Sequence, residues 1–504
     1  MRRSGGPAFL GFPISDGLEL SGGSINYFSG QVCSGGGDRF ENMPSGSAIY
    51  WSAATGSHEV HGCIYQKYVA SGAQVSLGFP VTDEVGVANG RASFFAGTRC
   101  GVGGPSGSGS AVYYVDGIGA HTVKGCIYDQ YYRQGGPAQH LGFPSSDEQA
   151  IAGGAVQYFD GHLCDVRGPA NSGSAIYKSS QGGVHNVQGC IYRKYLNEGG
   201  PEKHLNFPVS DELPIPGGAV SYFYGDNCGP DRGGMGQGAA IYAGPGGVHN
   251  VQGCIYRTYR LRGETSSPQG WPTTDEIVIP GGWVSYFQGN ACPGVPPQIN
   301  SSGSAIFASL DTGAHAVQGC IYTGYMRDHQ GPGGHLGFPT TDEIAIPGGW
   351  VSYFRGNACP GVPLRPEGNG SGSAIFASGN GVHAVQGCIY TGYMRDNGGP
   401  GGLLGFPTSD EIPLPFGWVS YFEGNACGSF RGPSNSGSAI YASAGGVHAV
   451  KGCIYKKYVE LGGPFPSGLG YPTSDELRGP NGWISHFEHG YIFADGSSVR
   501  VFIE

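Results

Sequence analysis

One phrase recurs eight times along this chain of 504 residues: Leu-Gly-Phe-Pro, or a close variant, followed shortly by Ser or Thr, then Asp and, in every copy but the first, Glu. Consecutive copies are 64 to 68 residues apart. The prolines of the copies are Pro13, Pro80, Pro144, Pro208, Pro272, Pro339, Pro407 and Pro472. A constant period of this length indicates one supersecondary unit repeated along the chain. Because no copy differs in kind from its neighbours, any function of the repeats is expected to be multivalent.

Each period is predicted to fold as three short strands and one short helix. In the copy that starts at Ser371, residues 374–378 and 382–385 have the pattern of two strands around a glycine-rich turn. Residues 387–397 carry apolar side chains at helical spacing and end at two glycines, which is a helix stop signal. Residues 417–422 then form the third strand. The sequence therefore predicts a β-rich α+β repeat protein of about eight units.

The period divides the chain into full repeats and two incomplete ends. The predicted parts are an N-terminal half unit, 1–44; repeats 45–104, 105–170, 171–235, 236–300, 301–370, 371–435 and 436–488; and a C-terminal hairpin, 489–504. Since an isolated hairpin has unpaired edges, we expect the ends either to complete one another within one molecule or to join molecules head to tail. The first residues, Met1–Pro7, align with Met394–Pro400, so the chain is expected to start inside a repeat of a longer precursor.

The composition indicates a folded, weakly charged protein. Only 13% of the residues are charged, against a typical figure of about 25%. The chain has 97 Gly, but 30 Tyr, 24 Phe and 6 Trp supply the apolar side chains that a disordered chain lacks. A net charge of -10, with Lys and Arg spread thinly, excludes a nucleic-acid partner. No apolar run approaches the roughly 18 residues of a membrane span, so no membrane insertion is expected.

The cysteines indicate an oxidising compartment. They occur twice per period, and joining each to the next uses all 14, whereas the offset pairing strands the first and the last. The predicted disulfides are Cys33–Cys63, Cys100–Cys126, Cys164–Cys190, Cys228–Cys254, Cys292–Cys320, Cys359–Cys388 and Cys427–Cys453. Zinc is the alternative, but Cys-x-x-Cys spacing is missing. Each bridge is expected to contribute about 3 to 4 kcal/mol. The chain is therefore predicted to be secreted or at the cell surface, with glycosylation sequons at Asn300 and Asn369.

The repeated phrase, with an upstream Ala-Ile-Tyr and Val-His-x-Val-x-Gly, resembles the LGFP repeat family over nearly the whole chain. The resemblance implies attachment to a cell wall, as in surface proteins of mycolic-acid-containing bacteria and the accessory C-terminal part of some mycoloyltransferases. It also implies repeats packed about a pseudo-rotational axis, in a ring or superhelical array. The paired cysteines and longer loops between strands depart from the bacterial pattern.

The most regular polar residues are an Asp in the phrase and a His in the second strand of each hairpin. The aspartates are Asp83, Asp147, Asp211, Asp275, Asp342, Asp410 and Asp475, and the histidines are His58, His121, His185, His249, His315, His383 and His448. An Asp just after a proline turn commonly accepts backbone hydrogen bonds, so both residue types are predicted to brace turns. Calcium binding and glycosidic cleavage are the alternatives for the carboxylates, but no Asp-x-Asp-x-Asp loop is present.

An enzyme is not expected. Seven equal Asp–His dyads would be an unusual way to build one active site, and the nucleophile motif Gly-x-Ser-x-Gly is missing. No cofactor and no metal ion is predicted.

A tryptophan in the third strand of each later repeat is the candidate binding residue. Trp283, Trp350, Trp418 and Trp483 occupy one repeat position, where earlier repeats have Ala155 and Ala219. Flat aromatic rings can stack on sugar rings and bind by avidity, or they can fill core space. We predict a non-enzymatic extracellular protein that attaches to surface or cell-wall polysaccharide. The alternative is a self-associating structural subunit of an extracellular fibre or coat.

Overall fold

The computed structural model describes residues 10–30, 32–33, 45–101, 103–228, 236–295, 302–360 and 371–504. The predicted glycosylation residues Asn300 and Asn369, and the segment Met1–Pro7, lie outside the described residues. The chain forms two compact units, Met1–Tyr256 and Arg257–Glu504, which we call unit 1 and unit 2. Each unit contains four antiparallel sheets of four strands.

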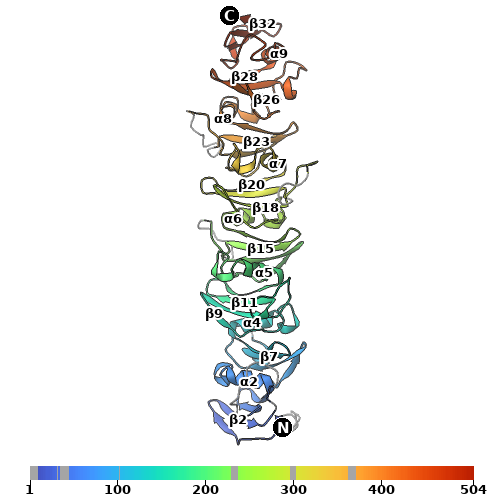
Figure 1. Ribbon diagram of the computed structural model, residues 1–504, viewed down its shortest axis with the longest axis vertical. Coiled ribbons are helices and arrows are strands. Elements are labelled where there is room, and N and C mark those ends of the chain that lie inside the picture. The colour runs from blue at the N-terminus through green and yellow to red at the C-terminus, as the bar shows by residue number, and fades with distance from the viewer. Residues whose placement is uncertain are drawn as a thin grey trace. The chain divides into compact units, whose positions relative to one another are not determined.

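The elements of unit 1 are coloured blue to green in Figure 1. Its strands are β1 (Leu18–Leu20), β2 (Gly23–Phe28), β3 (Ser47–Ser52), β4 (Gly56–His61), β5 (Val85–Val87), β6 (Gly90–Phe95), β7 (Ser110–Val115), β8 (Gly119–Lys124), β9 (Gln149–Ile151), β10 (Gly154–Phe159), β11 (Ser174–Ser179), β12 (Gly183–Gln188), β13 (Leu213–Ile215), β14 (Gly218–Phe223), β15 (Ala239–Gly244) and β16 (Gly247–Gln252). Its helices are α2 (Gly62–Ala70), α3 (Ala73–Ser76), α4 (Gly125–Arg133) and α5 (Gly189–Asn197), and α6 (Gly253–Leu261) contains the division between the units.

Unit 2 repeats the same order of elements. Its strands are β17 (Ile277–Ile279), β18 (Gly282–Phe287), β19 (Ser304–Ser309), β20 (Gly313–Gln318), β21 (Ile344–Ile346), β22 (Gly349–Phe354), β23 (Ser373–Ser378), β24 (Gly381–Gln386), β25 (Ile412–Leu414), β26 (Gly417–Phe422), β27 (Ser438–Ser443), β28 (Gly446–Lys451), β29 (Leu477–Gly479), β30 (Gly482–Phe487), β31 (Gly490–Ala494) and β32 (Val499–Ile503). Its helices are α7 (Gly319–Arg327), α8 (Gly387–Thr391), which continues as a π-helical turn over Gly392–Asp396, and α9 (Gly452–Glu460).

The predicted repeat architecture is confirmed, but each sheet has four strands instead of three. The additional strand has only three residues, such as Leu18–Leu20, and pairs with the strand that follows it. Each sheet also crosses the predicted repeat boundaries, since β2, before residue 45, pairs with β3, after it. The arrangement of the whole array as a ring or superhelix stays a prediction.

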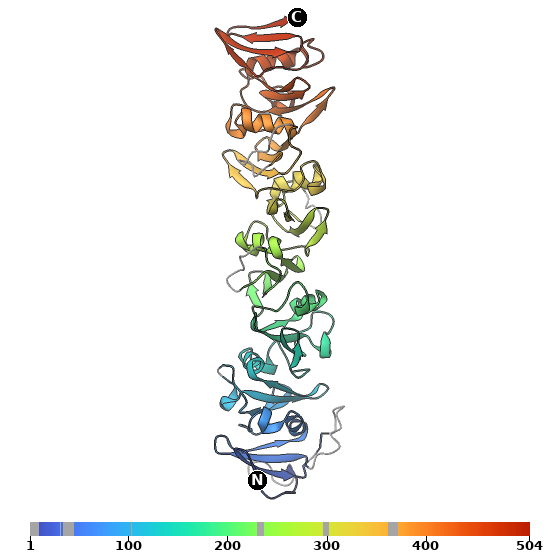
Figure 2. The same cartoon turned by 90° about the vertical axis from the view of Figure 1, so that its left-hand side faces the viewer.

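Within each unit, sheets and helices alternate (Figures 1 and 2). A buried tyrosine of the helix that follows a sheet contacts both that sheet and the next, as in α4. Tyr131 of α4 packs edge-on against Tyr113 of its own sheet, with ring centroids 5.4 Å apart. The same ring stacks on Phe159 of the next sheet, with centroids 4.7 Å apart. Each such aromatic pair contributes about 0.5 to 1.5 kcal/mol beyond the apolar area it buries. The helix therefore belongs to the cores of two consecutive repeats.

The residues of the repeated phrase hold this packing in place. Leu141 is fully buried, and Gly142 has a φ of 70°, which glycine adopts without strain. The carbonyl of Gly142 accepts a hydrogen bond of 2.6 Å from the Tyr131 hydroxyl, which satisfies that buried group. The ring of Phe143 lies over Gly90 of the preceding sheet, where a side chain would collide with it. The phrase is therefore a structural signature of contact between repeats.

Both ends of the chain form complete sheets. The C-terminal hairpin of β31 and β32 pairs with β30 of its own unit, with Trp483 opposite Ala494. At the other end, β2 pairs with β3. The expectation that the C-terminal hairpin is unpaired is therefore wrong, because the third strand of one repeat pairs with the hairpin of the next. That the two ends complete one another or join molecules stays a prediction.

Seven disulfides join the predicted pairs of cysteines, 26 to 30 residues apart in the sequence. Each bridge ties the loop after the second strand of a sheet to the first turn of the helix that follows that sheet. In the second repeat, for example, Cys100 follows β6 and Cys126 lies in α4. These loops vary in length between repeats, and the disulfide fixes their ends at the start of the helix.

Candidate functional site

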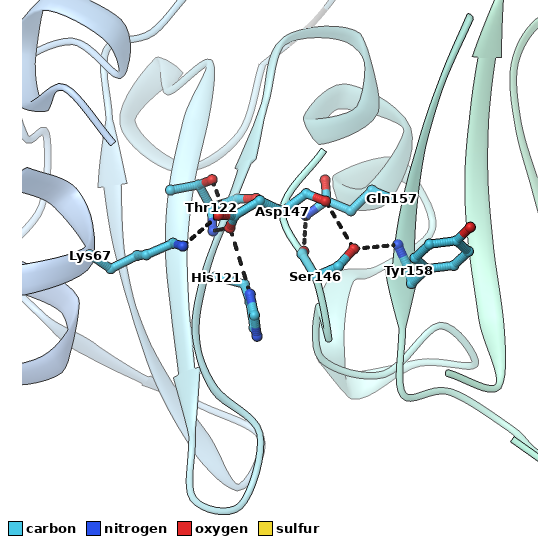
Figure 3. A network of polar contacts seen from close by, with 7 residues as sticks. All are labelled: Lys67, His121, Thr122, Ser146, Asp147, Gln157 and Tyr158. Carbon is cyan, nitrogen blue, oxygen red and sulfur yellow. Dashed lines mark hydrogen bonds and ion pairs between the residues drawn. The ribbon is translucent and has the colours of Figure 1, made fainter. Parts of the chain in front are cut away.

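In six of the eight sheets, a predicted Asp and a predicted His lie together at the end of the sheet. Asp147 follows the proline turn, and its Oδ1 accepts the backbone N–H of Thr122 at 2.9 Å. The same oxygen is 3.6 Å from Nδ1 of His121, in the last strand of the sheet. Lys67, from helix α2 of the preceding repeat, pairs with Oδ2 (Figure 3). The carboxylate thus joins a turn, a strand and the neighbouring repeat.

This Asp–His brace recurs through both units. The histidines all lie in the last strand of a sheet, and His249 occupies this place in β16. In six repeats the carboxylate Oδ1 lies 3.2 to 3.6 Å from the His Nδ1. The same oxygen accepts the next backbone N–H of the strand at 2.7 to 3.1 Å. The aspartates of these braces are Asp83, Asp147, Asp211, Asp342, Asp410 and Asp475.

The electrostatics of the brace keep the carboxylate ionised. Although burial alone would raise the pKa of Asp147, hydrogen bonds from His121, Lys67 and the Thr122 amide lower it below its ordinary value. The second ring nitrogen of the histidine also faces an acceptor, as where Nε2 of His315 lies 2.7 Å from the Thr312 carbonyl. A carboxylate and an imidazole whose polar atoms are engaged in this way brace a turn and are poorly suited to proton transfer.

Two equivalent grooves lie between consecutive repeats of unit 2. The Trp350 groove has a volume of about 650 Å³ and lies between the Cys292–Cys320 bridge and the strand that carries Trp350. The Trp418 groove, of about 690 Å³, lies between the Cys359–Cys388 bridge and Trp418. In both, the first turn of a helix forms one wall and the next sheet forms the other.

Of the four predicted tryptophans, Trp350 and Trp418 line these grooves with partly exposed rings. Trp350 is 52% exposed, and Trp418 and Trp483 are each 47% exposed, whereas Trp283 is half-buried. Because side chains alternate along a strand, Trp350 shares a face of β22 with Phe354, which packs on Tyr325 of α7. Trp350 therefore lies on the face that the preceding helix covers, beside the open part of that junction.

One exposed tryptophan was not predicted as a site residue. Trp51 is 47% exposed and lies on β3 opposite Ser24, which occupies the repeat position of Trp350. The first sheet thus places its tryptophan on the neighbouring strand, at the same face. The sequence does contain a signal for Trp51. The first repeat has the small residue Ser24 where later repeats have tryptophan, and it has a tryptophan where later repeats have Ala377 or Ala442.

Each groove also contains the Glu of the repeated phrase. Glu343 lines the Trp350 groove, and Glu411 lines the Trp418 groove. Burial raises the pKa of Glu343, although a hydrogen bond from Gln318 opposes the shift. Burial alone raises the pKa of Glu411 to about 7. The grooves therefore combine an aromatic face with a carboxyl group that is poorly stabilised in its charged form.

The part of the chain that the structure describes has neither a cluster of metal ligands nor a membrane-spanning helix. Within it, no three His, Cys, Asp or Glu side chains gather as a metal ion would require. No helix among the described residues is long and apolar enough to cross a membrane.

Comparison with known proteins identifies a repeat family. The sequence profile of the LGFP repeat matches residues 10–75, 77–139, 141–202, 270–330, 404–464 and 469–499, together more than half of the chain. A search of curated proteins finds no match.

The solved structures that are similar to this chain are only weakly similar. One is an ancestral GH74 enzyme, with 10% identity and a TM-score of 0.12 over 97% of this chain and 51% of that one. Another is the extracellular domain of a protein from B. thetaiotaomicron described as a hybrid two-component system, with 8% identity and a TM-score of 0.11 over 97% of this chain. The match spans 64% of that second structure, so less than two thirds of either is covered. TM-scores this low do not indicate a shared fold.

Proposed function

This chain belongs to the LGFP repeat family, and on that premise we propose that it is a non-enzymatic extracellular protein that attaches to surface or cell-wall polysaccharide through repeated weak sites. The grooves at Trp350 and Trp418 carry the proposal, since the same aromatic ring borders the same kind of groove in consecutive repeats. A sugar ring stacked on one indole gains little, but a polymer that reaches several grooves gains by avidity.

Two other observations support this proposal. The seven disulfides fit an oxidising, extracellular compartment. The Asp and His residues that would be the candidates for acid–base chemistry are engaged in braces between turn and strand. The exposed aromatic rings are then the groups best suited to contact a ligand.

The test is the double substitution Trp350→Ala and Trp418→Ala in the full chain. Because both rings are about half exposed, we expect the thermal midpoint to change little. Each lost stacking contact should weaken binding by about 1 kcal/mol, and multivalency should amplify the loss on insoluble wall polysaccharide. Tyr132→Ala is a matched control, since Tyr132 is an exposed aromatic residue that lines neither groove.

Binding that is unchanged in the double variant, with unfolding several degrees earlier, would assign the tryptophans to the core and contradict the proposal. An equal loss of binding in the Tyr132 variant would show that the effect is not specific to the grooves.

A structural subunit of a fibre is the second candidate. One exposed apolar residue begins the short edge strand of each sheet in unit 2: Ile277, Ile344, Ile412 and Leu477, which are 37% to 49% exposed. Exposed apolar edge strands favour lateral association between molecules. Negative-stain imaging and sedimentation of the native protein separate the two candidates, because a fibre subunit assembles without polysaccharide.

A further inference from the structure

The Glu of the repeated phrase pairs with a cation of the sheet that it precedes, in the second and third sheets. In the second sheet, Glu84 Oε1 is 3.0 Å from the guanidinium of Arg91. In the third sheet, Glu148 Oε1 is 2.8 Å from Nζ of Lys178. In these two repeats the chain itself supplies the positive group that this carboxylate accepts.

The cations occupy the positions that form the grooves in unit 2. Arg91 is at the repeat position of Trp418, the second residue of its strand. Lys178, which pairs across the strands with Ala155, is at the position of Ala442, which pairs with Trp418. The grooves of unit 2 are thus the places where repeats of unit 1 hold a basic side chain.

Neither groove of unit 2 is lined by such a cation, although Arg262, which pairs with Asp342, acts on Glu343 and opposes the rise of its pKa that burial causes. Among the described residues that line the two grooves there is no Lys, Arg or His. Glu343 still accepts a hydrogen bond of 3.4 Å from Gln318. Glu411 has neither a hydrogen bond nor an ion pair with any residue that the structure describes. A partly buried carboxylate without a partner is costly, so an external cation has a clear electrostatic advantage at the Trp418 groove.

We propose that the Trp418 groove selects sugar units with a free, protonated amino group. The proposal rests on the proposed polysaccharide function and names its ligand class. The ammonium group would take the place that Lys178 takes beside Glu148, and the sugar ring would stack on Trp418. The net charge of -10 favours a cationic polymer over an acidic one. The Trp350 groove is the weaker site, because Gln318 already contacts its Glu343.

Phe416 gives the Trp418 groove a second aromatic wall. Phe416 lines this groove, is 89% exposed and has a φ of 63°. The equivalent residue beside the Trp350 groove is Gly348, with a φ of 88°. A bulky aromatic side chain in the left-handed region is strained, and such strain is typically retained at functional sites. Of these two grooves, the Trp418 groove alone offers two aromatic surfaces around one carboxylate among its described lining residues.

The test compares two glycan probes that differ in charge. We would measure binding of the full chain to a β-1,4-linked glucosamine hexamer and to its fully N-acetylated counterpart at about pH 7, because burial raises the pKa of Glu411 to about 7 and a more acid buffer would neutralise its carboxylate. The wild-type chain should bind the free-amine hexamer roughly tenfold more tightly. The substitution Glu411→Gln, which keeps the shape of the side chain, should abolish most of this preference.

A second variant places the internal cation of the third sheet in the groove. Ala442→Lys should fold, because the third sheet has Lys178 at this position, and it should block the free-amine hexamer. Ala243→Lys is the control: it adds the same charge at the same strand position of the fourth sheet, opposite Ala219 instead of a tryptophan. This control should bind as the wild type does, and circular dichroism should confirm that all variants are folded.

The outcomes separate the two proposals. Equal binding of both hexamers, lost on removal of Trp350 and Trp418, overturns the amino-sugar inference and leaves the polysaccharide function in place. Binding of neither hexamer and of no wall polysaccharide overturns both. Equally tight binding of a lysine-rich peptide assigns the groove to basic proteins and overturns the inference. Loss of the preference in both Glu411→Gln and Ala442→Lys, but not in Ala243→Lys, supports it.

Discussion

At the scale of single residues, the repeated phrase stabilises the fold, and the binding that we propose is assigned to positions that vary between repeats. The Ser or Thr hydroxyl of the phrase accepts a backbone N–H twelve residues on, as between Ser146 and Tyr158 at 3.1 Å. The glycine carbonyl accepts a buried tyrosine hydroxyl, and the aromatic ring packs on the preceding sheet. The position of Trp350 and Trp418 changes between repeats without disturbing these contacts, since Ala155 and Ala219 also occupy it.

His448 makes a titratable contribution to stability whose sign follows from its contacts. Its hydrogen bond to Asp475 raises the pKa of His448, against an opposing effect of burial. Although burial alone would raise the pKa of Asp475, the hydrogen bond from His448 lowers it, so the carboxylate stays ionised in mild acid. A raised histidine pKa stabilises the fold fully below the unfolded value of about 6.5, and this contribution is lost as the pH rises through the folded pKa.

We therefore expect His448→Gln to lower the thermal midpoint at about pH 5.5 and to have little effect at about pH 9. Thermal unfolding of both chains across this range measures the difference. The wild type loses its stabilising imidazolium as the pH rises, so the difference between the two chains should shrink. A difference in thermal midpoint that grows with pH would contradict the assigned ion pair.

At the scale of elements, the turn that contains Phe416 exposes an aromatic ring but is strained, because Phe416 has a left-handed backbone conformation. Relieving the left-handed strain by Phe416→Gly is expected to stabilise the fold by up to about 1 kcal/mol, after the entropic cost of glycine is deducted. The same variant should bind polysaccharide more weakly, because the groove loses one wall. Gly348→Ala is the control, and should be destabilising because its φ of 88° suits glycine alone. A Phe416→Gly chain that is less stable, or that binds as before, contradicts this account of the turn.

Most of each repeat could be predicted from local patterns. The spacing of Ile389, Tyr390, Tyr393 and Met394 indicated the helix, and glycine-rich turns indicated the hairpins. The pairing that leaves no cysteine over indicated the disulfides. The three-residue strands were missed, because three residues are too few for a period of two. Two of them also contain a proline, Pro214 and Pro413, which is tolerated because these strands lie at the sheet edge.

The candidate site depended on contacts that the linear sequence hides. Lys178 reaches Glu148 across 30 residues, and Trp51 substitutes for a tryptophan on a neighbouring strand. Position-by-position comparison of repeats finds the tryptophans but not these exchanges between strands. They follow only from the register of the sheets.

At the scale of the whole molecule, the junction between a helix and the next sheet has two roles. It connects consecutive repeats, and it forms the groove that we propose as a binding site. Each helix packs on its own sheet and on the next, so every junction within a unit has the same geometry, as the cores around Tyr325 and Tyr393 show. The groove at the Trp350 junction is accordingly repeated at the Trp418 junction. The account requires a chain with several equivalent weak sites instead of one strong site.

The number of binding sites per chain tests this claim most directly. We would titrate the full chain by calorimetry with a disaccharide unit of the polysaccharide that retains it, since this ligand is too short to bridge two grooves. The account predicts at least two sites per chain, of which Trp350→Ala removes one, Trp418→Ala removes another, and the double variant removes both. A single site per chain, or a stoichiometry that survives the double substitution, would contradict it.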